Sequence, residues 1–308
     1  MSKKSCTFAA AKDNRGLQRL MAKIGVFDSG YGGLTILESM RRRLPQYDYV
    51  YLGDNARAPY GNHSFDVIYQ YTLQAVRYLF SQDCTLVILA CNTASARALR
   101  TIQQRDLPRI NEQMVNDQMV NVLGVIRPTV EIVPSLTRTG HVGILATPAT
   151  VSSESYVLEL NKTSDRLSIT QLACPMWVPL IESGEHMQPG ADYFVDLYLR
   201  QIFTQDPQID TLVLGCTHYP LLKPKIDQWI EEQLPSLQGG DGGRLIVVQQ
   251  GKLVADSLLD YLSRHDEYRS QLSEQGSCRY LTTENADRFA QSASLFLSTP
   301  IQAEHINL

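Results

Sequence analysis

The sequence predicts an α/β protein built from two related lobes, and two observations lead to this prediction. Short runs rich in Val, Ile and Leu alternate with amphipathic helical segments along most of the 308 residues, a pattern typical of parallel sheets covered by helices. Two motifs also recur, because IGVFDSG (24–30) resembles VGILATP (142–148) and TLVILACNT (85–93) resembles TLVLGCTH (211–218). We therefore expect one sheet in each lobe and a shared cleft between them.

Eight segments are expected to form strands, because they are short, apolar and bounded by turn-forming residues. In chain order they span residues 23–27, 49–53, 86–90, 122–126, 141–146, 168–173, 211–215 and 245–248. The polar segment at 109–122, which contains QMVN at 113–116 and again at 118–121, predicts a linker between the lobes or an exposed insertion. The Gly-rich segments DSGYGG (28–33) and LQGGDGGR (237–244) match no nucleotide-binding motif, so we interpret the second as a loop.

Composition and charge are those of a globular protein, with 44% hydrophobic residues, 19% charged residues and a formal net charge of −4. Clustered Lys and Arg, which nucleic acids and anionic membranes require, are not a feature of this chain. No apolar stretch is as long as a membrane span, and the N-terminus lacks the apolar core of a signal peptide. The six cysteines form no C-x-x-C pair. We therefore expect a reducing, cytoplasmic setting, without membrane or direct nucleic-acid partners.

Side chains capable of chemistry follow four of the expected strands. In parallel sheets, ligands bind beyond the carboxyl ends of the strands. We therefore expect these side chains to line one crevice: Asp28 and Ser29, then Cys91, Asn92 and Thr93, then Thr147 and Thr150, and finally Cys216, Thr217 and His218. Asp28 and Ser29 are explained equally well as a helix N-cap.

Cys91 and Cys216 are the candidate reactive thiols. Each follows a strand and precedes a helix-like segment, where the helix dipole and free backbone N–H groups lower the pKa of a thiol. The other four cysteines are not expected to react: Cys84 and Cys174 as buried residues, and Cys6 and Cys278 as peripheral ones.

Two thiols across a cleft could form a redox pair, bind a metal or act as two bases. Cys216 and His218 alone do not make the four-ligand set of a zinc site, and the two cysteines lie farther apart in the sequence than a typical redox pair. As two bases, one thiolate would remove a proton from a carbon and the other thiol would protonate the opposite face. That reaction inverts a stereocentre, and Asp28 and His218 could relay its protons.

Six motifs together resemble the glutamate racemase family, in the order expected for it. They are FDSGYGGLT (27–35), PYG (59–61), ACNTAS (90–95), ATPAT (146–150), CPMWVPLIE (174–182) and GCTHYPLL (215–222). The resemblance extends from about residue 22 to residue 298. It implies a racemase without cofactor or metal that interconverts L- and D-glutamate, the D-form of which supplies peptidoglycan synthesis.

The resemblance also implies a set of site residues. By motif, the two bases fall on Cys91 and Cys216, the aspartate beside the first on Asp28, the histidine beside the second on His218, and the family glutamate on Glu182. From the residues alone, Glu182 could equally be a surface helix residue and PYG a simple turn. The implied substrate contacts are Asp28, Ser29, Pro59, Tyr60, Gly61, Asn92, Thr93, Thr147, Thr150, Thr217 and His218.

The family fold has two pseudo-symmetric lobes, with the active site between them and the chain returning to the first lobe near its end. This predicts a flexible extension at 1–21, a lobe A at 22–117 with 224–308, and a lobe B at 118–223. It also implies a homodimer. In some bacterial members, N-terminal extensions accompany activation by a peptidoglycan precursor. VVQQGKLVAD (247–256) departs from the family, because it lacks the acidic and serine pattern often seen there.

Three alternatives stay open at this point. A racemase for aspartate or another amino acid would share the motifs, although DSG and the HYP after the second Cys-Thr favour glutamate. Some relatives inhibit DNA gyrase as a separate activity, which would make the chain also a binding protein. A thiol-redox protein is the third alternative.

Overall fold

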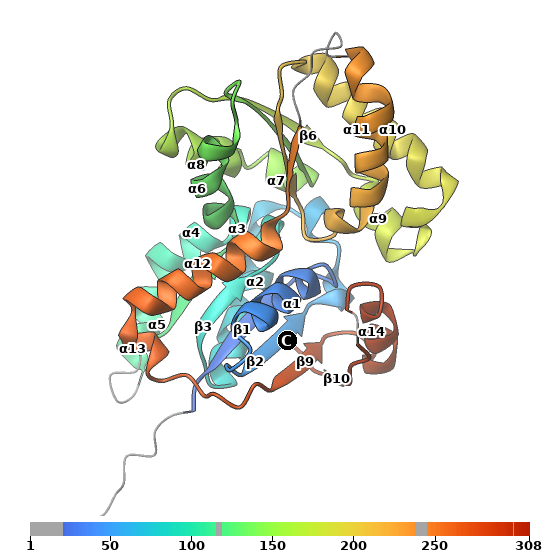
Figure 1. The fold of residues 1–308 in the computed structure, drawn as a ribbon. Coiled ribbons are helices and arrows are strands. Elements are labelled where there is room, and N and C mark those ends of the chain that lie inside the picture. The colour runs from blue at the N-terminus through green and yellow to red at the C-terminus, as the bar shows by residue number, and fades with distance from the viewer. Residues whose placement is uncertain (1–20, 115–118, 238–244, 298) are drawn as a thin grey trace, which may run out of the picture.

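The computed structural model describes residues 21–114, 119–237, 245–297 and 299–308, and it contains two parallel sheets flanked by helices (Figure 1). The predicted fold class is therefore confirmed. Several expectations lie outside the described residues: the N-terminal extension up to residue 20 with Cys6, the middle of the QMVN repeat and most of the Gly-rich loop at 237–244.

The larger sheet has six parallel strands in the order β10-β9-β2-β1-β3-β4. Its side chains alternate between two hydrophobic clusters, so that Ile24 packs towards α1 and α12 whereas Phe27 packs towards α2. Burial on both faces explains the continuous apolar runs in the sequence. The strands are β1 (Lys23–Asp28), β2 (Tyr49–Gly53), β3 (Cys84–Leu89), β4 (Asn121–Gly124), β9 (Cys278–Thr282) and β10 (Ala303–His305).

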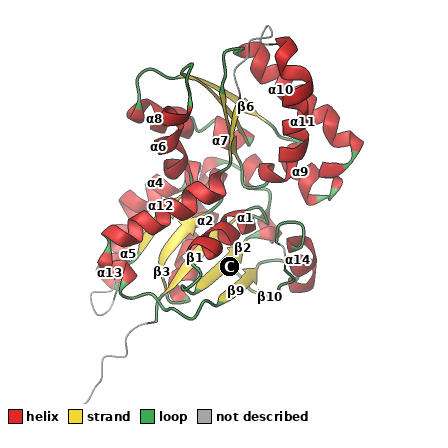
Figure 2. Cartoon of the chain, viewed as in Figure 1, coloured by secondary structure: helices red, strands yellow, loops and turns green. Residues whose placement is uncertain are grey.

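The smaller sheet has four parallel strands in the order β6-β5-β7-β8. Leu212 packs with the cluster that includes α10 and α11, whereas Val213 packs with the cluster that includes α6 and α8. Helices therefore cover both of its faces (Figure 2). The strands are β5 (His141–Ala146), β6 (Ser168–Ala173), β7 (Thr211–Gly215) and β8 (Ile246–Val248).

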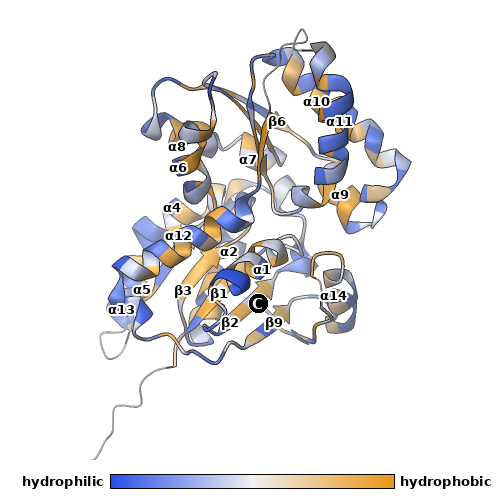
Figure 3. Ribbon diagram, viewed as in Figure 1, coloured by the Kyte–Doolittle hydropathy of each residue, from blue (hydrophilic) through white to orange (hydrophobic). Residues whose placement is uncertain are grey.

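The long helices are amphipathic and carry most of the layer contacts. They are α1 (Gly33–Arg43), α2 (Phe65–Ser81), α6 (Ile126–Leu136), α8 (Ser155–Thr163), α10 (Pro189–Gln205), α11 (Lys223–Leu237), α12 (Gln250–Arg264) and α14 (Ala286–Ala293). Shorter ones are α3 (Asn92–Arg97), α4 (Leu99–Thr101), α5 (Leu107–Gln113), α7 (Pro148–Val151), α9 (Trp177–Glu182) and α13 (Asp266–Arg269). Figure 3 shows hydrophobic residues along β3 and hydrophilic ones on α13. No helix within the described ranges is both long and apolar enough to cross a membrane.

The chain passes between the sheets twice. It leaves the larger sheet after β4 through α6, and it returns after β8 through α12, which packs against both α1 and α6. The repeated motifs form corresponding neighbours, because β1 pairs with β3 and β5 pairs with β7. The lobe boundaries stay a prediction; the smaller sheet takes its last strand, β8, from residues 246–248.

The structure adds two strands to the eight expected and shortens two of them, those expected at 122–126 and 245–248. β9 and β10 escaped prediction because CRYLT mixes polar with apolar residues and AEH is a short, largely exposed edge strand. Cys278, expected at the periphery, is half-buried on β9. The segment expected as a strand over 122–126 ends its strand at Gly124, because Val125 already has helical backbone angles and Ile126 begins α6.

A buried carboxylate, Asp210, fixes the turn before β5 at the amino end of the smaller sheet. It accepts hydrogen bonds from the Thr137 hydroxyl at 2.6 Å and from the backbone N–H groups of Arg138 at 2.7 Å and Thr139 at 2.9 Å. Burial acts to raise the pKa of Asp210, but these hydrogen bonds outweigh it and hold the pKa below its ordinary value.

We predict that Asp210→Ala lowers the free energy of unfolding at pH 7 by about 1–2 kcal/mol, because it leaves three partly buried donors without their acceptor. Since the folded-state pKa of Asp210 is depressed, its contribution is present above the ordinary carboxyl pKa and is lost as the pH falls. Urea unfolding at pH 7 and pH 3 measures both effects. Equal stability of the two proteins at pH 7 would contradict the prediction.

Candidate active site

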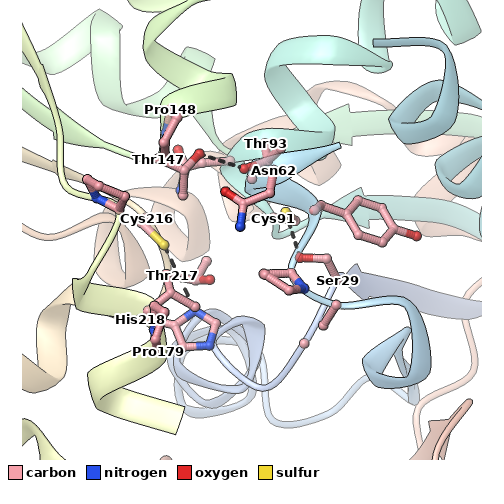
Figure 4. Close-up of a pocket in the computed structure, with 18 of the residues that line it drawn as sticks. Ser29, Asn62, Cys91, Thr93, Thr147, Pro148, Pro179, Cys216, Thr217 and His218 are labelled. Carbon is pink, nitrogen blue, oxygen red and sulfur yellow. Dashed lines mark hydrogen bonds between the residues drawn. The ribbon is translucent and has the colours of Figure 1, made fainter. Parts of the chain in front are cut away.

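The two thiols lie at the carboxyl ends of strands from different sheets. Cys91 follows β3 and caps α3, where its Sγ accepts a hydrogen bond from the Ala94 N–H at 3.4 Å. Cys216 follows β7. Both thiols line one cavity, and Figure 4 shows their sulfur atoms approaching it from opposite sides.

Most of the predicted site residues line this cavity. Asp28 and Thr150 are the exceptions, because they are buried directly behind it. The predicted residues in the lining are Ser29, Pro59, Tyr60, Gly61, Cys91, Asn92, Thr93, Thr147, Glu182, Cys216, Thr217 and His218. The lining also includes residues that the sequence did not single out, among them Asn62, Pro148, Val178 and Pro179.

The surroundings of Cys91 are dominated by burial and negative charge. Its Sγ lies 3.2 Å from the Ser29 hydroxyl. Burial first, and then the charge of Asp28, raise the pKa of Cys91 to about 12. The expectation that the helix N-terminus would lower the pKa of this thiol is therefore wrong. The Ala94 N–H acts in the expected direction, but α3 has six residues and its effect is outweighed.

Asp28 is buried close enough to Cys91 for its charge to act on the thiol. Its carboxylate accepts hydrogen bonds from the Gly30 N–H at 2.8 Å and from the Thr217 hydroxyl at 3.3 Å. Burial raises the pKa of Asp28, although the charge of His218 and these hydrogen bonds act against it. The N-cap alternative for Asp28 and Ser29 does not hold, because α1 begins after Gly32 and no side chain caps it.

Cys216 is paired with a histidine rather than an aspartate. Its Sγ lies 3.9 Å from Nδ1 of His218, and Nε2 of the same ring lies 3.0 Å from Oε1 of Glu182. Burial alone would lower the pKa of His218, but hydrogen bonds to Cys216 and Glu182 outweigh it and raise the pKa to about 10. Glu182, for which a surface position was an alternative, ends α9 and lines the cavity. At neutral pH an imidazolium therefore lies between the sulfur and the carboxylate.

Hydroxyl groups from both lobes meet at the rim between the two thiols. The Thr93 hydroxyl on α3 lies 2.9 Å from that of Thr147 and 3.4 Å from that of Thr150, and the last two are 3.0 Å apart. Tyr60 contributes differently, because its hydroxyl donates to the buried carboxylate of Asp54. The Tyr60 hydroxyl is thus already engaged within the protein.

The glycines of DSGYGG allow close packing around the site, between the lobes at Gly32 and within one lobe at Gly33, a role that the sequence did not reveal. A Cβ at Gly32 would lie 2.3 Å from Oγ1 of Thr217 and 2.5 Å from Nδ1 of His218, and a Cβ at Gly33 would lie 2.5 Å from that of Asp28. The backbone of Gly32 is ordinary right-handed helix, so space rather than conformation requires glycine. The motif is therefore a packing surface for the site.

Cys174 is buried as expected, yet it also lines the cavity. Burial raises the pKa of its thiol well above the ordinary value, which fits the expectation of an unreactive cysteine. Within the described part of the chain, no three or more His, Cys, Asp or Glu side chains are grouped so that they could hold a metal ion.

Comparison with known proteins gives consistent findings. The model of the Asp/Glu/Hydantoin racemase family matches residues 25–242. The glutamate racemase of Ruegeria sp. (strain TM1040) is 37% identical over 291 residues, covering 91% of this chain and 98% of that protein.

Two solved structures are similar over nearly the whole chain. The glutamate racemase of Francisella tularensis in complex with D-glutamate has a TM-score of 0.77 and 29% identity, and the match covers 93% of this chain and 98% of that one. The Escherichia coli glutamate racemase, in complex with L-glutamate and the activator UDP-MurNAc-ala, has a TM-score of 0.63 and 25% identity, with coverage of 89% and 95%.

We predict that Glu182→Gln lowers the pKa of His218 from about 10 towards its ordinary value, because one of the two hydrogen bonds that raise it loses its charge. NMR titration of the His218 ring measures this directly. Glu185→Gln, at an exposed position just beyond α9, is the matched control.

The same change has a consequence for stability. The raised folded-state pKa of His218 stabilises the protein fully below the unfolded pKa of about 6.5, and this contribution is lost as the pH rises towards 10. Urea unfolding between pH 6 and pH 10 should therefore show a smaller loss of stability in Glu182→Gln than in the unchanged protein. Parallel curves for the two proteins would contradict the assignment.

We also predict that Gly32→Ala displaces Thr217 and His218, because its Cβ would overlap both side chains. The pKa of His218 should fall as its ring moves from Cys216 and Glu182, and unfolding should become easier by about 1–3 kcal/mol. Gly190→Ala on α10 is the control, since nothing lies within 4 Å of its Cβ. A His218 titration that Gly32→Ala leaves unchanged would show that the close approach is unimportant.

Proposed function

The chain belongs to the Asp/Glu/Hydantoin racemase family, and we propose that it interconverts L- and D-glutamate with Cys91 and Cys216 as its two bases. The observation that carries this proposal is the pair of thiols at the carboxyl ends of β3 and β7, which line one cavity from two different sheets. An α-carbon held between them could lose its proton to one sulfur, and the planar carbanion that forms could gain a proton from the other. The names of the similar proteins support glutamate as the substrate.

The reaction needs one thiolate and one thiol at a time. In one direction the Cys91 thiolate takes the α-proton, and the Cys216 thiol gives its proton to the opposite face of the α-carbon. In the reverse direction the roles exchange, so protons and charges balance. A carbon acid as weak as an α-amino acid calls for a strong base, and the high pKa of Cys91 makes its thiolate one.

The groups behind the thiols reset them between turnovers. His218 carries a proton at neutral pH and contacts Cys216, so it can return a proton to that sulfur. Asp28 acts electrostatically on Cys91, and its own raised pKa makes it a candidate acceptor for the thiol proton. Each thiol is thus served by a separate titratable group.

Substrate carboxylates would be held by dipoles and by the His218 imidazolium rather than by a lysine or an arginine. Among the described residues in the cavity lining there is no Lys or Arg, whereas the hydroxyls of Ser29, Thr93 and Thr147 and the N-terminus of α3 are there. Fixed dipoles of this kind stabilise developing negative charge in a site without needing to reorganise. They would also support the carbanion that forms when the α-proton leaves.

We extend the proposal to the biological setting. The D-glutamate product would supply peptidoglycan synthesis in the cytoplasm, and the enzyme would act as a homodimer. Because the Escherichia coli structure contains UDP-MurNAc-ala as an activator, a peptidoglycan precursor of this class is the candidate activator here.

We predict that the purified protein exchanges the α-hydrogen of both glutamate enantiomers in deuterated water and racemises them without an added cofactor. NMR follows loss of the α-proton signal and circular dichroism follows racemisation. Aspartate, assayed in parallel, should turn over far more slowly. Absence of exchange with either glutamate enantiomer, with and without UDP-MurNAc-alanine, would overturn the proposal.

Cys91→Ser and Cys216→Ser should each lower kcat/KM for racemisation by at least about a hundredfold, because a hydroxyl is a much weaker acid than a thiol. Cys84→Ser is the matched control, since Cys84 is equally buried at the far end of β3. If Cys91→Ser racemised glutamate nearly as fast as the unsubstituted protein, the assignment of Cys91 as a base would be wrong.

A further inference from the structure

A closed ring of buried hydrogen bonds lies beside the Cys91 thiol. The side-chain amide of Asn92 donates from Nδ2 to Oε1 of Gln250 at 2.6 Å, Gln250 donates from Nε2 to the Tyr156 hydroxyl at 3.0 Å, and that hydroxyl donates to Oδ1 of Asn92 at 2.7 Å. All three side chains are almost completely buried. Within the ring each of them donates one hydrogen bond and accepts one, so the ring fixes the orientation of both amides.

The three members of the ring come from parts of the chain that are far apart in sequence. Asn92 is the first residue of α3, immediately after Cys91. Gln250 is the first residue of α12, which returns the chain to the larger sheet, and Tyr156 lies on α8 beside the smaller sheet. The ring therefore joins the first turn of the Cys91 helix to both sheets.

Gln250 also contacts the outgoing connection between the sheets. Its Nε2 lies 2.9 Å from Oγ1 of Thr129 on α6 and 3.2 Å from the carbonyl oxygen of Val125. The backbone next to Gln250 is packed closely onto α1, because a Cβ at Gly251 would lie 2.4 Å from Oγ of Ser39. Gln250, which begins the returning connection between the sheets, thus contacts the outgoing one.

Tyr156 also packs against the backbone next to the other thiol. The residue before Cys216 is Gly215, and a Cβ there would lie 3.2 Å from Cε2 of Tyr156. The aromatic side chain of Tyr156 therefore lies against the backbone next to Cys216. Its hydroxyl donates a hydrogen bond to Asn92, the residue after Cys91. Tyr156 spans the two thiol-bearing strand ends directly.

We propose that Gln250 and Tyr156 are positioning residues that set the separation and alignment of the Cys91 and Cys216 thiols. The inference rests on the proposed two-thiol function, because the spacing matters only if both sulfurs serve one carbon. Small displacements of reacting groups are costly, since a 1 Å misplacement can slow a reaction about a hundredfold.

The test uses Tyr156→Phe, which keeps the ring and removes the hydroxyl, and Gln250→Met, which keeps the volume and removes the amide. Tyr49→Phe is the matched control, because the Tyr49 hydroxyl is also buried and bonds to the Leu44 carbonyl oxygen at 3.0 Å, away from the cavity. Tyr156→Phe alone decides the question if Gln250→Met fails to fold. Racemisation of glutamate and of α-deuterated glutamate is measured in both directions.

Both test variants should lower kcat about tenfold or more, and the primary deuterium isotope effect on kcat should rise because proton transfer becomes slower than the other steps. The kcat of the double variant should be little lower than that of the less active single variant, since both changes break the same ring of hydrogen bonds. A purely structural role would reduce the amount of folded enzyme and leave the isotope effect unchanged. An isotope effect equal to that of Tyr49→Phe in both variants would overturn the proposal.

A second readout does not depend on racemase activity. Iodoacetamide labelling, followed by peptide mass spectrometry, gives the alkylation rates of Cys91 and Cys216 in the same molecule. Both variants should release the first turn of α3, so that Cys91 is labelled several-fold faster relative to Cys216 than in the unsubstituted protein. If the unchanged protein does not racemise glutamate, the proposed function fails, and this ratio alone decides whether the ring positions the thiol. A ratio that neither variant changes would overturn the positioning role.

Discussion

The proposed reaction depends on one constraint: two sulfur atoms must approach a single carbon from opposite sides. Neither sheet alone can provide this, because the carboxyl ends of parallel strands in one sheet lie along the same edge. Here β3 and β7 come from different sheets, and both end at the same cavity. Three features bring those two strand ends together and hold them there. They are the burial of these strands on both faces, the two crossings of the chain between the sheets and the glycines of DSGYGG.

The two thiols occupy different electrostatic surroundings, although the motifs that carry them are alike. A buried carboxylate, Asp28, acts on Cys91 and helps to raise its pKa, whereas Cys216 faces the imidazolium of His218, which is held by Glu182. A symmetric reaction does not require symmetric bases. It requires only that each sulfur can be reset to the protonation state that the next turnover needs, and a carboxylate on one side and a charged histidine on the other provide two separate routes for the proton.

Sequence reasoning succeeded where the information is local. Apolar runs bounded by turns located eight strands, and the residues just after them located most of the cavity lining, because a parallel sheet presents its strand ends at one edge. It failed where tertiary contacts decide. The raised pKa of Cys91 follows from complete burial, which outweighs the helix N-terminus. Position 32 requires glycine because a Cβ there would overlap Thr217, which lies 185 positions away in the chain. β10 has too few residues and too little burial to leave an apolar pattern.

A buried polar ring is an expensive way to fill a core, because three polar side chains lose their water and gain hydrogen bonds of modest net value. Apolar side chains of the same volume would pack in the same space without that cost. What they would not supply is direction, since an apolar contact tolerates rotation and sliding whereas a closed ring of donors and acceptors has one arrangement. The ring of Asn92, Tyr156 and Gln250 stands where direction matters, one residue from one thiol and against the backbone of the other. Its position therefore argues for a precision that the reaction needs rather than for stability alone.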